Sequence, residues 1–214
     1  MSRILIIGGH GKIALLLAPL LAARGDEVTS VVRNPDHVDD VHAAGATALV
    51  LDVAAADTKT LSDALAGFDA VVWSAGAGGG DAARTYAVDR DAAIRAMDAA
   101  EVAGVSRFVM VSWIGSSPDH GIDPSDSFFP YADAKLAADE HLRRSSLEWT
   151  VLGPGTLTSD DATGRITTEP TGRGEISRAD VAQVIAATLG DAATIRRTIR
   201  FGAGPTPISE ALSA

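Results

Sequence analysis

The sequence predicts an α/β protein built on a parallel, doubly wound sheet with helices on both faces. Short, continuous, β-branched apolar runs recur along the chain, which is typical of strands that are covered on both faces. Helix-length segments alternate with these runs and indicate βαβ crossovers. The chain has 214 residues, enough to bury a sizeable core, and no linker, internal repeat or low-complexity tail divides it. We therefore expect a single domain over residues 1–214.

The predicted elements alternate strictly as far as Leu152. Arg3–Ile7 is the first apolar run and is expected to form a strand, followed by a helix at Lys12–Arg24 that Gly25 ends. The remaining elements of this part, in chain order, are a strand at Val28–Val32, a helix at Pro35–Ala44, a strand at Thr47–Leu51, a helix at Lys59–Ala66, a strand at Ala70–Trp73, an alanine-rich helix at Ala83–Ala103, a strand at Arg107–Val111, a helix at Tyr131–Ser145 and a strand at Trp149–Leu152.

The pattern loosens after Leu152. Residues 153–177 are rich in Gly, Pro, Thr and Asp, and we expect an irregular segment on the substrate side with one short strand at Arg165–Thr168. Order returns with a helix at Ala179–Leu189 and a last strand at Thr198–Phe201. This part is predicted to form a small C-terminal lobe of the same domain.

Composition limits the partners. The net charge of −10 disfavours broad binding to nucleic acid or to an anionic membrane, because phosphate attraction needs a basic face. No apolar stretch is long enough to span a bilayer, and the N-terminus shows no signal-peptide pattern. Cysteine is absent, which is compatible with a reducing cytoplasm. A cytoplasmic protein acting on a small molecule is the expectation.

A glycine-rich turn separates the first predicted strand from the first predicted helix. Gly8 permits the tight turn, Gly11 lets backbone approach a pyrophosphate, and Ala14 allows close packing of helix on sheet. The spacing Gly-x-x-Gly-x-x-Ala is less complete than the full dinucleotide fingerprint. Its position before a helix N-terminus nevertheless predicts phosphate binding, with three further candidate contacts at His10, Lys12 and Ile13.

The end of the second predicted strand indicates which cofactor is preferred. A carboxylate there would bind a free ribose 2′-hydroxyl, whereas an arginine accommodates a 2′-phosphate. The sequence Val31-Val32-Arg33-Asn34 has no acid at this place, and Lys12 adds positive charge. We predict NADP(H) over NAD(H), with Arg33 on the phosphate.

Two more strand ends carry candidate cofactor contacts. Asp52 and Val53 follow the third strand, where an Asp can meet the adenine amino group. Small residues follow the fourth strand and would let a ribose lie close to backbone, namely Ser74, Ala75 and Gly76.

Tyr131 and Lys135 stand four residues apart and therefore share one helix face. A free tyrosine has a pKa of about 10 and is a poor base at neutral pH. A neighbouring ammonium, together with the positive ring of an oxidised nicotinamide, would lower that pKa. We predict that Tyr131 exchanges a proton with a substrate oxygen and that Lys135 also holds the nicotinamide ribose.

A serine after the fifth predicted strand completes the candidate catalytic group. Ser112 can donate to a substrate carbonyl as charge develops on its oxygen. Ser116 and Ser117 lie in the same loop and are alternatives for this role.

The chain resembles the short-chain dehydrogenase/reductase superfamily, in its atypical branch of small NAD(P)-binding, epimerase-like proteins, over nearly its whole length. The resemblance rests on five motifs: Gly8-Gly9-His10-Gly11 with Ala14, Ala99-Ala100 leading into Val105–Ser112, Tyr131 with Lys135, Pro154-Gly155, and Ile176–Ala182. It implies a Rossmann-like fold, a nicotinamide cofactor that Pro154 helps to hold, and catalytic roles for Ser112, Tyr131 and Lys135.

The resemblance has departures that bear on the pocket more than on the cofactor cradle. Ser74 stands where many members have Asn, Trp113 where a second serine is usual, and Gly153 where an Arg usually precedes Pro-Gly. Three functions stay open at this point. The first is an NADP(H)-dependent reductase or dehydrogenase acting on a small carbonyl, alcohol or quinone-like substrate. The second is a non-catalytic NADP(H)-binding sensor, and the weakest is a sugar epimerase or dehydratase.

Other chemistry is disfavoured. The five histidines show no metal-ligand spacing, so no metal site is predicted, and no Gly-x-Ser-x-Gly elbow indicates a serine hydrolase. Trp113, Phe128 and Phe129 flank the predicted site and either line an apolar pocket or pack the loop. The alanine-rich segment 83–103 suits either a homodimer contact or close packing on the sheet.

Overall fold

A nine-stranded sheet forms the centre of the fold, counted over residues 1–77, 81–170 and 172–213, which the computed structural model describes. Seven neighbouring strands are parallel, in the order β3-β2-β1-β4-β5-β6-β10. They are β1 (Arg3–Ile7), β2 (Glu27–Val32), β3 (Thr47–Val50), β4 (Ala70–Trp73), β5 (Arg107–Val111), β6 (Glu148–Pro154) and β10 (Arg197–Ala203). The winding reverses between β1 and β4, the place where such sheets bind ligands at the carboxyl ends of their strands. The predicted Rossmann-like sheet is confirmed.

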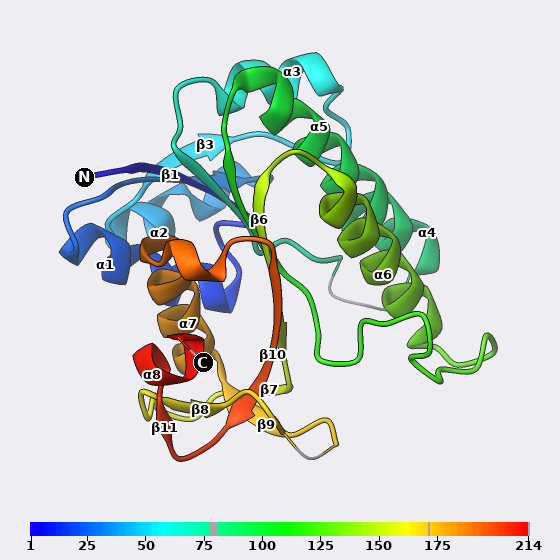
Figure 1. Cartoon of the computed structure of the whole chain (residues 1–214). Helices are drawn as coiled ribbons and strands as arrows, with labels where there is room; N and C mark the ends of the chain where they lie inside the picture. Colours follow the sequence, from blue (N-terminus) through cyan, green and yellow to red (C-terminus); the bar gives the residue numbers. More distant parts are fainter. Residues whose placement is uncertain (78–80, 171, 214) are drawn as a thin grey trace.

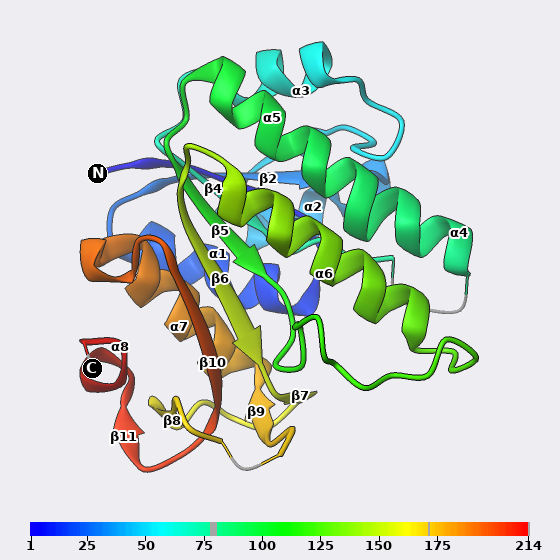
Figure 2. The ribbon, with the colours of Figure 1, turned by 45° about the vertical axis from the view of Figure 1, so that its right-hand side comes forward.

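Helices cover both faces of this sheet (Figures 1 and 2). One face carries α1 (Lys12–Ala23), α2 (Val38–Ala43) and α7 (Arg178–Gly190), and the other carries α3 (Thr58–Leu65), α5 (Ala93–Ala103) and α6 (Phe129–Arg144). The strand β1 shows why, since Ile4 and Ile6 pack on the first face and Leu5 and Ile7 on the second. In the described residues, no helix has the length and apolar character that a membrane span requires.

The alanine-rich helix is not uniform. It begins with α4 (Ala82–Thr85), widens into a π-helical segment at Tyr86–Ala92 and continues as α5. The wide segment brings Asp89 into the interior, and such segments are frequent at functional sites. The predicted helix at 35–44 likewise consists of a 3₁₀ turn at Pro35–His37 followed by α2.

The C-terminal lobe lies beside the β10 edge, in the lower part of Figure 1. The strand β8 (Arg165–Thr167) pairs antiparallel with both β10 and β11 (Thr206–Pro207). A separate parallel pair joins β7 (Thr156–Thr158) to β9 (Glu175–Ser177). The short helix α8 (Ile208–Ser213) follows β11, and a 3₁₀ turn at Ala192–Thr194 precedes β10. Apart from β10, the sequence predicted only β8 among these elements, since segments as short as the others carry no readable periodicity.

Candidate functional site

The glycine turn between β1 and α1 is shaped by close backbone contacts. Gly8 has a φ of +89°, and a Cβ built on it would lie 2.6 Å from the Cα of Ala75. A Cβ on Gly9 would lie 2.5 Å from the Cβ of Ser30. Gly11 is the N-cap of α1, and no side chain caps the first turn of this helix. The turn thus leaves the helix N-terminus open to an anion, as the predicted phosphate contact requires.

Replacing Gly8 with alanine is expected to lower the free energy of unfolding by roughly 2 kcal/mol or more, because a positive φ and a backbone clash add. Affinity for NADPH should fall as well. Urea unfolding and a fluorescence titration with NADPH measure the two effects. Gly25→Ala is the matched control, since Gly25 has a φ of +90° but nothing within 4 Å of a built Cβ. Equal losses in the two variants would contradict the role of close approach at Gly8.

The other residues of the turn contribute in different ways. His10 stacks on His37 with ring centroids 3.6 Å apart, and its Nε2 lies 2.8 Å from an oxygen of Asp40. Lys12 is exposed on the first turn of α1. Ile13 is buried in the core, so a contact to phosphate can involve only its backbone N–H. His10 therefore ties the glycine turn to the segment after β2.

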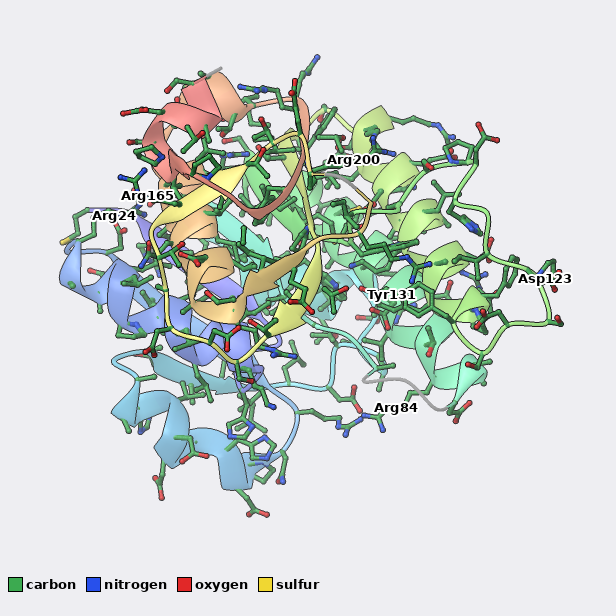
Figure 3. All side chains as sticks on the ribbon, turned by 90° about the horizontal axis from the view of Figure 1, so that it is seen from below. Arg24, Arg84, Asp123, Tyr131, Arg165 and Arg200 are labelled. Carbon is green, nitrogen blue, oxygen red and sulfur yellow. The ribbon has the colours of Figure 1, made fainter. Side chains whose placement is uncertain are left out.

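A pocket of about 190 Å³ opens beside the turn, at the carboxyl ends of the strands around β1. Six predicted cofactor residues line it together: Gly8, Arg33, Asp52, Val53, Ala75 and Gly76. Ser74 does not line it, although its N–H donates to the Ile7 carbonyl and holds β4 beside β1. Arg84 of α4 also lines this pocket. Figure 3, a view of the side where the strands end, labels Arg84. This pocket has the place and lining expected for the adenosine half of a dinucleotide.

A second pocket of about 370 Å³ lies at the ends of β5 and β6. It is lined by the predicted residues Ser112, Tyr131 and Pro154 and by Trp113, Ile114, Phe128, Gly155, Thr156, Leu157 and Arg173. The aromatic rings form one cluster, with Phe128 centred 5.1 Å from both Trp113 and Tyr131. Phe129 instead packs against His120. Of the two readings left open for the aromatic residues, pocket lining therefore holds for Trp113 and Phe128.

Lys135 is buried beneath the second pocket and does not line it. Its side chain is 1% exposed. The Nζ donates to the carbonyl of Val111 at 2.8 Å and lies 3.3 Å from the sulfur of Met110. The ammonium thus fixes the end of β5. The predicted contact with a ribose must use another of its three N–H donors, and it needs the buried Nζ to become accessible from the pocket, which Lys135 does not line.

Asp139 organises the serines. One turn beyond Lys135 on α6, its Oδ2 accepts from Ser112 Oγ at 2.5 Å and from Ser116 Oγ at 2.6 Å. Ser117 is partly exposed and lines neither pocket. Ser112 alone of the three candidates lines the second pocket. The single hydroxyl hydrogen of Ser112 is used in the hydrogen bond that it donates to Asp139. To donate to a substrate, as predicted, Ser112 must first break this hydrogen bond.

The buried carboxylates of Asp89 and Asp139 influence the pKa values of Tyr131 and Lys135. Burial raises the pKa of Asp89 and of Asp139, and it lowers the pKa of Lys135, which both carboxylates partly offset. Burial also raises the pKa of Tyr131 well above its ordinary value, and the negative charges of Asp89 and Asp139 raise it further. Tyr131 is therefore a protonated phenol at neutral pH in this structure. Such a group is suited to donating a proton.

Gly153 stands where the resembled family usually has an arginine, and an arginine lies beside it on the neighbouring strand β10. Arg200 of β10, labelled in Figure 3, is in register with Gly153. Its Cγ would lie 3.3 Å from a Cβ built on Gly153, and its Nη2 donates to the carbonyl of Ser116 at 3.1 Å. The absence of a side chain at Gly153 thus leaves space for the side chain of Arg200, which holds the serine loop.

Four charged residues at the site are not among the residues predicted from the sequence: Arg84, Asp89, Asp139 and Arg173. A signal existed for Asp139, which continues the four-residue spacing of Tyr131 and Lys135 on one helix face. Nothing in the local pattern marked the others. Arg84 reaches the site from α4, Asp89 from the π-helical segment and Arg173 from the C-terminal lobe.

The residues present fit a nicotinamide dinucleotide, because a glycine cradle that a Cβ would fill lies between an uncapped helix and the first pocket. Residues 8–192 match the NAD(P)H-binding family. The chain belongs to this family. The predicted resemblance to atypical short-chain dehydrogenases/reductases is thereby confirmed, as is a nicotinamide cofactor.

Relatives and solved structures agree over nearly the whole chain. It is 33% identical to the uncharacterized sugar epimerase YhfK of Bacillus subtilis, with 98% of each chain covered. A proposed NAD-dependent epimerase/dehydratase from Bacillus halodurans superposes with a TM-score of 0.91 at 34% identity, covering 99% of each chain. The oxidoreductase ylbE from Lactococcus lactis gives a TM-score of 0.87 at 30% identity, with 98% of this chain and 94% of that chain covered.

Proposed function

We propose that the chain is an NADP(H)-dependent oxidoreductase that reduces a small carbonyl or quinone-like substrate. The observation that carries this is the position of Tyr131. Its phenol lines an apolar, aromatic pocket, and burial and two carboxylates raise its pKa and keep it protonated. A protonated phenol in such a pocket suits reduction, in which a substrate oxygen takes up a proton.

In this proposal the residues around the second pocket have separate roles. A nicotinamide cofactor held by the glycine turn and the first pocket would supply the hydride, and with it the two electrons, that reduction of a carbonyl carbon requires. Tyr131 donates its proton to the carbonyl oxygen, giving the alcohol, and recovers a proton from solvent. Trp113 and Phe128 exclude water from the pocket. Asp139 and Lys135 hold Ser112 and the end of β5 in place.

The apolar lining also weighs against a sugar substrate. Relatives of this chain include one named as a sugar epimerase. A sugar needs many hydrogen-bond partners, but most of the residues around the second pocket are apolar.

A sensor without turnover is the second candidate, because the Nζ of Lys135 donates to Val111 and is buried away from the pocket.

Tyr131→Phe is expected to lower turnover about 10²- to 10⁴-fold, the usual contribution of a positioned proton donor. Its affinity for NADPH should be nearly unchanged. The assay follows NADPH oxidation with a panel of aldehydes and quinones. Tyr86→Phe is the matched control, since Tyr86 is the other of the chain's 2 tyrosines and lines neither pocket. If wild-type protein binds NADPH but reduces nothing in the panel, the sensor candidate is favoured.

The pH dependence should reflect the raised pKa of Tyr131. The phenol stays protonated from pH 6 to pH 9, so the rate of reduction should not fall with the ionisation of this group. Oxidation of the alcohol needs the phenolate and should therefore speed up as the pH rises over the same range. Single-turnover rates in both directions measure this. A reductive rate that falls with a midpoint near pH 7, and does so only when Tyr131 is present, would contradict it.

A further inference from the structure

Arg173 is a cation at the rim of the second pocket. Among the described residues that line this pocket, Arg173 is the one that carries a charge. Its guanidinium carbon lies 5.7 Å from the ring centroid of Trp113 and 5.7 Å from that of Phe128, within cation–π range. Within the described residues no carboxylate forms an ion pair with it, although Glu175 is only two positions away.

The backbone around Arg173 is fixed against the pocket wall. A Cβ built on Gly155 would lie 2.5 Å from the carbonyl oxygen of Arg173, so this close approach requires glycine. The next residue, Gly174, accepts from the N–H of Thr156 at 3.0 Å, at the start of the β7–β9 pair. These contacts of the C-terminal lobe therefore hold the backbone of Arg173 in a defined position at the pocket.

This placement suggests a recognition role for the charge. A guanidinium that lies over aromatic rings at this distance makes no hydrogen bond to them, so its N–H donors stay available for a carboxylate. The chain carries a net charge of −10, which repels anions in general. Arg173 is a local exception, because it lies at an apolar pocket and no carboxylate in the described part of the chain pairs with it. The cofactor's phosphates have separate cations available, because Arg33 and Arg84 line the first pocket.

We infer that the second pocket takes a planar, apolar acceptor that carries a carboxylate, and that Arg173 binds this carboxylate. The rings of Trp113 and Phe128 hold the apolar part, and Tyr131 faces the group that is reduced. This inference rests on the proposed function for the reduction itself. The binding of the anion can be tested without turnover.

The test compares 2-naphthoate with its neutral counterpart 2-naphthamide, by calorimetric titration into protein saturated with NADP⁺. Naphthoate should bind about five- to tenfold more tightly, the gain expected for a charge-assisted contact that is partly open to solvent. Arg173→Gln should remove this difference and leave naphthamide binding unchanged. Arg144→Gln, which removes an exposed arginine of α6 that pairs with Glu140, should leave both unchanged.

The outcomes separate the two proposals. Equal binding of the two probes to the wild type, or an unchanged preference in Arg173→Gln, overturns the anion site even if the protein reduces neutral carbonyls. A loss of NADPH affinity in Arg173→Gln also overturns it, because the arginine would then serve the cofactor. An Arg173-dependent preference for naphthoate supports the site even in a protein that turns over no substrate.

Discussion

Asp139→Ala is expected to lower the free energy of unfolding by about 3–5 kcal/mol, because two buried hydrogen bonds to its carboxylate, from Ser112 and Ser116, are lost together. Asp139 is 0% exposed and Lys135 is 1% exposed. Without the carboxylate of Asp139, only the smaller electrostatic contribution of Asp89 stabilises the ammonium of Lys135, and the hydroxyls of Ser112 and Ser116 lose their shared acceptor. Urea unfolding followed by circular dichroism measures the loss.

Two further variants make this result interpretable. Glu140→Ala removes the next carboxylate on the same helix, which forms an exposed pair with Arg144, and should cost about 1 kcal/mol at most. The double variant Lys135→Met/Asp139→Leu removes both charges and should be more stable than Asp139→Ala. If Asp139→Ala costs no more than Glu140→Ala, Asp139 does not balance the buried ammonium.

The parallel sheet could be predicted because its strands are local features of the sequence. The runs at Arg3–Ile7, Ala70–Trp73 and Arg107–Val111 match β1, β4 and β5 residue for residue. Burial on both faces makes such runs continuously apolar and easy to recognise. By contrast β7 and β9 are three-residue strands that exist only through pairing with each other, and no local pattern records such a pairing.

The same distinction separates the two halves of the site. The glycine turn and the Tyr131–Lys135 pair lie within short segments whose spacing is itself the signal. The lining of the second pocket combines the loop after β5, the start of α6, the end of β6 and the C-terminal lobe, so Arg173 could be placed only once the fold was known. The direction of the pKa shift of Tyr131 also needed the structure. From the sequence, Lys135 was expected to lower it, whereas burial and the carboxylates of Asp89 and Asp139 raise it.

Arg33→Ala is expected to weaken NADPH binding by about 10- to 100-fold and to leave NADH binding within about twofold, the effect of losing charge-assisted bonds to one phosphate. Arg33 is exposed at the end of β2, lines the first pocket, and has no hydrogen-bond or ion-pair partner in the described part of the chain. It is therefore free to bind the 2′-phosphate. Fluorescence titration with both cofactors measures the change.

Arg84 decides how this result is interpreted, because it lines the same pocket from α4 and brings a second guanidinium. If both arginines hold the phosphate, Arg84→Ala should also weaken NADPH selectively, and the double variant should bind the two cofactors equally. Asp52 lies in the same pocket, but its Oδ1 already accepts from the N–H of Ala54. Tighter binding of NADH than of NADPH by the wild type would mean that this carboxylate, rather than the arginines, governs the choice, and the NADP(H) preference would be wrong.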